Sequence, residues 1–146
     1  MKRTIIIAIL TSFTFLNASA QKSEVFVSGG KAIKGYDPVA FFKQSKAVKG
    51  VDSLSYNWNN ATWLFANAED LNAFKAAPEK YAPQYGGYCA YGTADGHKAP
   101  TQTDTWTIVN DKLYFNYNSK VKEMWTKDQP NLIIKADQQW PTVKTQ

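Results

Sequence analysis

Two pairs of short β-favouring segments, each separated by a turn rich in asparagine, constrain the fold of this chain most strongly. Residues 54–58 and 62–66 form the first pair, with Asn57, Asn59 and Asn60 at or near the turn. Residues 105–109 and 113–117 form the second pair, around residues 110–112. Short runs of this composition that flank such a turn predict antiparallel β-hairpins.

Helices are predicted after each hairpin. A capping asparagine precedes residues 68–77, and a second helix is expected from Asn118 or Ser119 to Lys127. Pro130 is expected to end that helix, and a last helix is expected over residues 131–139, with Pro141 as its stop. The sequence therefore predicts an α+β fold, in which a small antiparallel sheet built from two hairpins packs with three or four short helices.

The first twenty residues have the pattern of a secretory signal peptide. Met1-Lys2-Arg3 is positively charged, Ile5 to Leu16 is mostly apolar, and Ala18-Ser19-Ala20 forms a small-residue cleavage site. Cleavage near Ala20 would deliver the protein to the periplasm or the exterior of the cell. We expect residues 21–31 to be a flexible lead-in, apart from residues 25–27, which could pair as an edge strand, and residues 32–142 to be one domain. No later segment is long enough to predict membrane insertion.

The charge of the chain argues against nucleic acid as a partner. The net charge is +5, and removal of Lys2 and Arg3 with the signal peptide lowers it to +3 and leaves no arginine. Arginine is the residue best suited to bidentate contacts with phosphate and guanine. The remaining lysines are therefore predicted to form a solvated surface.

The stretch from Lys80 to His97 concentrates the residues that could carry chemistry. It contains the only cysteine, Cys89, the only histidine, His97, and half of the glycines. Gly86-Gly87 is a hinge that can adopt positive φ angles and so bring segments close together. A thiolate and an imidazole suit copper or zinc, so Cys89 and His97 are candidate metal ligands.

Two ligands do not complete such a site. The others would be Asp37, Asp95 or Asp104, a tyrosine, or groups from a second chain, which leaves a homodimer open. The alternative is that Cys89 is a small buried hydrophobe and binds no metal.

The tyrosines of the same stretch suggest a different kind of site. Tyr85, Tyr88 and Tyr91, with Gly86 and Gly87 between them and tryptophans nearby, could line a pocket for a small organic molecule or a partner protein. Ordinary packing in the core is the competing interpretation.

An enzyme is the third hypothesis. Cys89 and His97 could act as nucleophile and base, with Asp37 or Asp104 orienting the imidazole. The local signatures of cysteine hydrolases are absent from the sequence, so we favour a non-catalytic module.

Three motifs resemble one known family. They are Gly35-Tyr36-Asp37-Pro38-Val39-Ala40-Phe41-Phe42, the run from Pro78 to Ala90 that reads PEKYAPQYGGYCA, and Gly96-His97-Lys98. Together they resemble the YHS domain family, in particular its exported single-domain bacterial members. The resemblance implies a small module of the kind associated with metal handling. Cys89 and His97 match positions typical of the exported branch, whereas Ala40 stands where metal-linked members have a cysteine.

Overall fold

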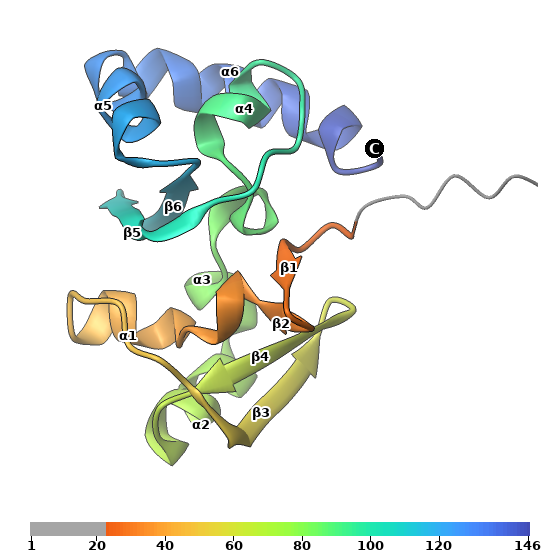
Figure 1. Ribbon diagram of the computed structural model, residues 1–146, viewed down its shortest axis with the longest axis vertical. Helices are drawn as coiled ribbons and strands as arrows, with labels where there is room; N and C mark the ends of the chain where they lie inside the picture. Colours follow the sequence, from red (N-terminus) through yellow and green to blue (C-terminus); the bar gives the residue numbers. More distant parts are fainter. Residues whose placement is uncertain (1–22) are drawn as a thin grey trace, which may run out of the picture.

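The structure, a computed structural model, describes residues 23–146 and has the α+β architecture that the sequence predicts. The described part contains three antiparallel sheets of two strands each (Figure 1). The expectation that the two predicted hairpins build one sheet is wrong in this detail, because each hairpin forms a sheet of its own. The predicted signal peptide, residues 1–20, lies outside the described residues.

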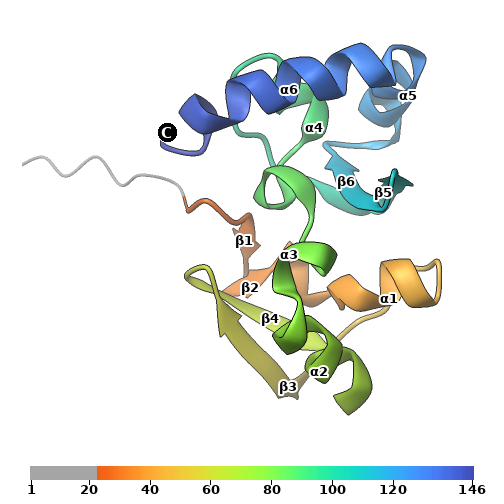
Figure 2. The ribbon, with the colours of Figure 1, turned by 180° about the vertical axis from the view of Figure 1, so that it is seen from behind.

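The lower half of the molecule in Figure 1 is formed by the first part of the chain. Its elements are β1 (Val27–Ser28), β2 (Lys31–Ala32), the short helix η1 (Ile33–Gly35), α1 (Pro38–Lys43), β3 (Val51–Trp58), β4 (Ala61–Phe65), α2 (Ala68–Ala76) and α3 (Pro78–Tyr81). Figure 2 shows α3 between the two halves.

The upper half is formed by the rest of the chain. Its elements are η2 (Gln84–Gly87), α4 (Ala90–Ala94), β5 (Gln102–Val109), β6 (Lys112–Asn116), α5 (Ser119–Lys127) and α6 (Gln129–Val143). The long helix α6 runs across the top of this half and packs on α4 (Figure 2).

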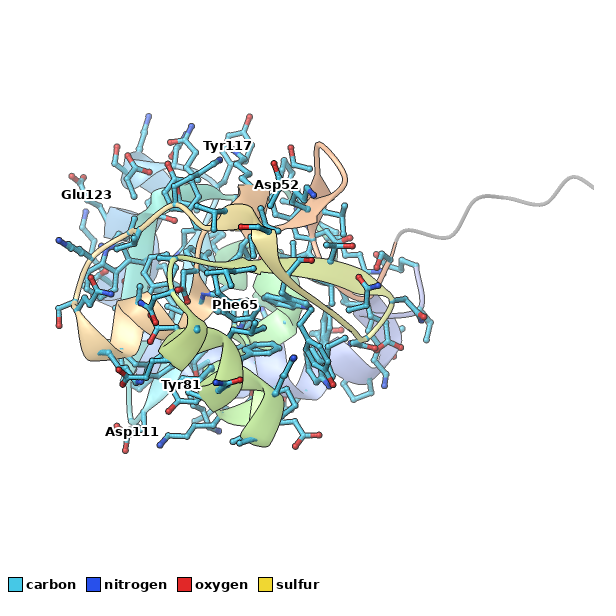
Figure 3. The ribbon with its side chains drawn as sticks, turned by 90° about the horizontal axis from the view of Figure 1, so that it is seen from below. Asp52, Phe65, Tyr81, Asp111, Tyr117 and Glu123 are labelled. Atoms are coloured by element: carbon cyan, nitrogen blue, oxygen red, sulfur yellow. The ribbon has the colours of Figure 1, made fainter. Side chains whose placement is uncertain are left out.

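The buried apolar residues form two clusters, which strand β6 joins. Leu113 and Phe115 belong to the first cluster, which also contains Trp63, whereas Tyr114 between them belongs to the second cluster with Trp125. Neighbouring side chains of a strand point to opposite faces, so one strand can serve two cores. Phe65, another member of the first cluster, lies at the centre of the view in Figure 3.

The turns of both predicted hairpins have the backbone geometry that their residues favour. Asn59 and Asn60 have φ angles of 49° and 57°, and Asn110 and Asp111 have φ angles of 50° and 58°. Two consecutive residues with positive φ are typical of the two-residue turn that matches the twist of a hairpin. Asparagine and aspartate tolerate this conformation better than most residues. The strand pairing on either side of each turn confirms both hairpin predictions.

The last helix is longer than its prolines suggested. Helix α6 starts at Gln129 and continues through Pro141 to Val143, so the predicted bounds of 131–139 are wrong at both ends. Pro130 fits because the first turn of a helix has no intrahelical partner for its N–H groups. Pro141 lies in the last turn, where it removes only the bond to the carbonyl of Asp137.

The segment expected as a lead-in packs on the rest of the fold, and the edge pairing expected within residues 25–27 is found at Val27. Val25 is buried in the first cluster, and the N–H of Phe26 donates to the carbonyl of Gly86 at 2.9 Å. Strands β1 and β2 then pair through Val27 and Ala32. Among residues 23–146, no helix combines the length and the apolar character needed to span a bilayer.

Candidate functional site

Cys89 is held in the interior as the N-cap of helix α4. Its side chain is 1% exposed, its Sγ accepts the N–H of Gly92 at 3.4 Å, and the thiol donates to Oδ1 of Asn116 at 3.6 Å. Burial raises the pKa of this thiol above its ordinary value, because the interior disfavours the thiolate. The surroundings therefore favour a neutral thiol that caps a helix.

Asn116 is a partner that the sequence reasoning missed. It is fully buried in β6, and its Oδ1 also accepts the N–H of Tyr91 at 3.2 Å, while its Nδ2 has no hydrogen-bond partner within residues 23–146. No local pattern distinguishes Asn116 from the turn asparagines, because only the packing of α4 against β6 brings it to Cys89.

His97 lies close to α4 but remains exposed. Its N–H donates to the carbonyl of Gly92 at 3.0 Å, and its Nε2 lies 3.3 Å from the position that a Cβ would take at Gly92. Cys89 and His97 thus both contact Gly92. Their side chains differ in environment, since the sulfur is enclosed and the imidazole faces solvent.

Asp37, the third residue of the predicted metal site, has other partners. It caps helix α1: its Oδ1 accepts the N–H groups of Val39 and Ala40 at 2.8 and 3.3 Å, and its Oδ2 accepts the N–H of Ala66 at 2.8 Å. Burial raises its pKa to about 6, and the neighbouring carboxylate of Asp70 adds to the shift. Within residues 23–146, no three His, Cys, Asp or Glu side chains are arranged so that they could hold a metal ion.

The three candidate tyrosines do not share one wall. The hydroxyl of Tyr85 donates to Oδ1 of Asp137 at 2.8 Å, and that of Tyr88 donates to the carbonyl of Ser23 at 2.7 Å. Tyr91 packs against the second core cluster. Tyr85 and Gly86 line the pocket described next, whereas Gly87 does not.

A cavity of about 350 Å³ lies where the end of the β3–β4 hairpin, η2 and α6 meet. Among the described residues, its walls combine four aromatic side chains, Trp58, Trp63, Tyr85 and Trp140, with three acidic ones, Glu24, Glu79 and Asp137. Its volume falls in the range of small-molecule sites, which is roughly 300–1,000 Å³. The sequence pointed to Tyr85 and Gly86, but the tryptophans and acidic residues come from segments far apart in the chain, so no spacing could identify them.

Local packing fixes the walls of this pocket. The indole Nε1 of Trp63 donates to the carbonyl of Trp58 at 3.0 Å, and the ring of Tyr85 lies 5.9 Å from the ring of Trp140. Gly86 has a φ of 62°, and a Cβ at this position would come within 1.8 Å of the carbonyl oxygen of Glu24. Only glycine lets the lead-in segment approach η2 this closely.

The structure thus places the predicted residues in three environments. Cys89 and His97 flank Gly92, Asp37 caps α1, and Tyr85 with Gly86 lines an aromatic pocket. A search for related proteins found no match among protein-family models, curated proteins or solved structures.

Proposed function

We propose that this chain is a non-catalytic module that binds a small organic molecule in the pocket between β3–β4, η2 and α6. The observation that carries the proposal is the cavity of about 350 Å³, walled by aromatic residues from three separate parts of the described chain. Cys89 has a structural role in this proposal, because it caps α4 with a neutral thiol.

The chemistry of the walls supports an organic ligand. Aromatic rings offer large apolar surfaces, and a few fixed polar groups among them orient a ligand. Here the polar groups are the Tyr85 hydroxyl, which Asp137 holds in place, and carboxylates at the rim.

The copper or zinc site predicted from Cys89 and His97 has less support. A thiophilic ion needs a thiolate, whereas burial raises the pKa of the Cys89 thiol, and this thiol already donates to Asn116. Asp37 already accepts backbone N–H groups from Val39, Ala40 and Ala66. Membership of the YHS family is a proposal that rests on the three sequence motifs alone.

The five indole N–H groups allow a direct test of the pocket. Trp58, Trp63 and Trp140 line it, whereas Trp106 and Trp125 lie elsewhere and serve as internal controls. We would titrate ¹⁵N-labelled protein with a library of organic fragments of fewer than about 20 non-hydrogen atoms that includes neutral, cationic and anionic members. We expect some fragments to shift the Trp58 and Trp140 signals and to leave those of Trp106 and Trp125 in place.

A pair of variants controls for weak surface binding. Trp140→Leu keeps an apolar side chain but removes a wall of the pocket, and Tyr117→Leu changes an aromatic residue that is 49% exposed and lies outside it. Fragments should lose affinity for the first variant and keep it for the second. A library that shifts no pocket tryptophan, or that shifts all five equally, would refute the proposed function.

A further inference from the structure

We infer that the pocket selects organic ammonium ions, an inference that rests on the proposed function and adds the charge of the ligand. The carboxylates of Glu24, Glu79 and Asp137 line the cavity, and no lysine, arginine or histidine of the described chain does. The net charge of the whole chain is +5, and it is +3 without Lys2 and Arg3 of the predicted signal peptide. The pocket therefore has the opposite sign to the protein that surrounds it.

These carboxylates are available to a ligand. None of the three forms an ion pair with another described residue, although ion pairs occur at Asp52, Glu69, Asp70 and Asp95. Asp137 accepts one hydrogen bond, from Tyr85, and its second carboxylate oxygen is bonded to no described side chain. A hollow lined by charge of one sign concentrates the field and attracts the opposite charge.

The aromatic residues around the cavity form two inclined pairs. The rings of Trp58 and Trp63 are 6.0 Å apart and inclined by 57°, and those of Tyr85 and Trp140 are 5.9 Å apart and inclined by 62°. The face of an aromatic ring is negatively polarised, and tryptophan attracts cations most strongly. One ring of each pair is buried, Trp63 at 0% and Tyr85 at 4% exposure, and supports the partly exposed ring of Trp58 or Trp140. The rings of Trp58 and Trp140, next to carboxylates, are therefore the ones that can meet an alkylated ammonium head group, which is both apolar and positively charged.

The same walls disfavour other charged ligands. A metal ion needs converging oxygen, nitrogen or sulfur ligands, and within residues 23–146 the three carboxylates do not form a group that could hold one. An anion would meet carboxylates without a cation among the described lining residues. An organic cation satisfies both the rings and the charge.

Three compounds of nearly the same shape isolate the effect of charge. Choline is positive, 3,3-dimethylbutan-1-ol replaces its nitrogen by carbon and is neutral, and 3,3-dimethylbutanoate is negative. We would titrate each into the full mature chain and follow the indole signals of Trp58 and Trp140. We expect choline to bind about tenfold more tightly than the alcohol, and the anion not to bind. Half-molar salt should lower the affinity for choline and leave the affinity for the alcohol unchanged.

Charge-neutralising variants test which carboxylates are responsible. Glu79→Gln and Asp137→Asn should each lower the affinity for choline several-fold and leave the affinity for the alcohol unchanged. In Asp137→Asn the amide oxygen can still accept the hydrogen bond from Tyr85. Glu123→Gln makes the same charge change on α5, at the edge of the view in Figure 3, and should have no effect.

The outcomes separate the inference from the function on which it rests. If the alcohol binds as well as choline, the charge inference is wrong but the organic pocket stands. If none of the three compounds binds while other fragments do, the inference is equally refuted. If no fragment binds at all, the proposed function itself fails.

Discussion

Asp37 is a buried carboxylate, and the neighbouring carboxylate of Asp70 disfavours its charged form. It is fully buried at the start of α1, beside Asp70, which is also buried and contacts Lys43 at 3.3 Å. Three backbone N–H groups stabilise the charged form of Asp37, but burial outweighs them and raises its pKa to about 6.

The stability of the protein should depend on the protonation of Asp37. The folded pKa lies above the unfolded value of 3.8, so its stabilising contribution is present in full below about pH 4 and is lost as the pH rises through about 6. Asp70→Asn removes the neighbouring charge and should lower the pKa of Asp37, as measured by a carboxyl ¹³C titration. Glu69→Gln, a change at an exposed side chain, should leave it unchanged. An Asp37 that titrates near pH 4 in the parent chain would contradict this prediction.

The thiol of Cys89 should react slowly in the folded protein. The side chain is 1% exposed and burial raises its pKa, so both access and the thiolate fraction are low. With the thiol reagent DTNB at pH 8, we expect the reaction to be at least about a hundredfold slower in native protein than in guanidinium chloride. A rapid reaction of the native protein would show an accessible, activated thiol and would support the hypotheses that Cys89 is a metal ligand or a nucleophile.

At the scale of single elements, the sequence predicted what local chemistry determines. The hairpin turns at Asn59-Asn60 and Asn110-Asp111 and the caps Asn67 and Asn118 act within a few residues, so their patterns are visible in the chain. Helix α6 was mispredicted because a proline is tolerated in the first turn, and the packing of the helix on α4 outweighs a second proline near its end.

The pocket could not be predicted in the same way. Its walls come from the lead-in, the β3–β4 hairpin, η2 and α6, and no spacing relates Glu24 to Trp58 or Trp140. Tyr85 and the glycine hinge were the visible signals, and the hinge marked a real close approach, that of Gly86 to Glu24. Glu24 lies far from Gly86 in the sequence, so no local pattern could identify it as the partner.

A pair of glycine substitutions measures this approach. Gly86→Ala should lower the free energy of unfolding by about 2 kcal/mol or more, because the positive φ is strained and the Cβ meets the Glu24 carbonyl. Gly30→Ala also has a positive φ, of 75°, but nothing lies within 4 Å of its Cβ, so it should cost only about 1 kcal/mol. Urea unfolding followed by circular dichroism measures both. Equal losses would show that the contact with Glu24 is unimportant.

At the scale of the whole molecule, two core clusters share one strand. Residues 113–115 of β6 alternate between the clusters, and α3 contacts β6 as well as the lower half. Neither cluster can lose β6 without exposing part of the other. This sharing makes the two halves one cooperative unit.

Substitutions in either cluster should therefore affect one common transition. Phe74→Leu in the first cluster and Trp125→Leu in the second each remove a fully buried ring, and each should cost about 1–4 kcal/mol. We would follow thermal unfolding by far-UV and by near-UV circular dichroism. For each of the three proteins, the parent and the two variants, the far-UV curve should coincide with the near-UV curve. Separate transitions, with one half melting at an unchanged temperature, would contradict the shared core.

The walls of the pocket come from both halves, and this gives the protein a practical property. A compound that fills the cavity binds only when the hairpin and α6 are both in place, so occupancy shifts the folding equilibrium toward the native chain. Heating curves in the presence of candidate metabolites can therefore rank natural ligands without a label and without an enzymatic assay.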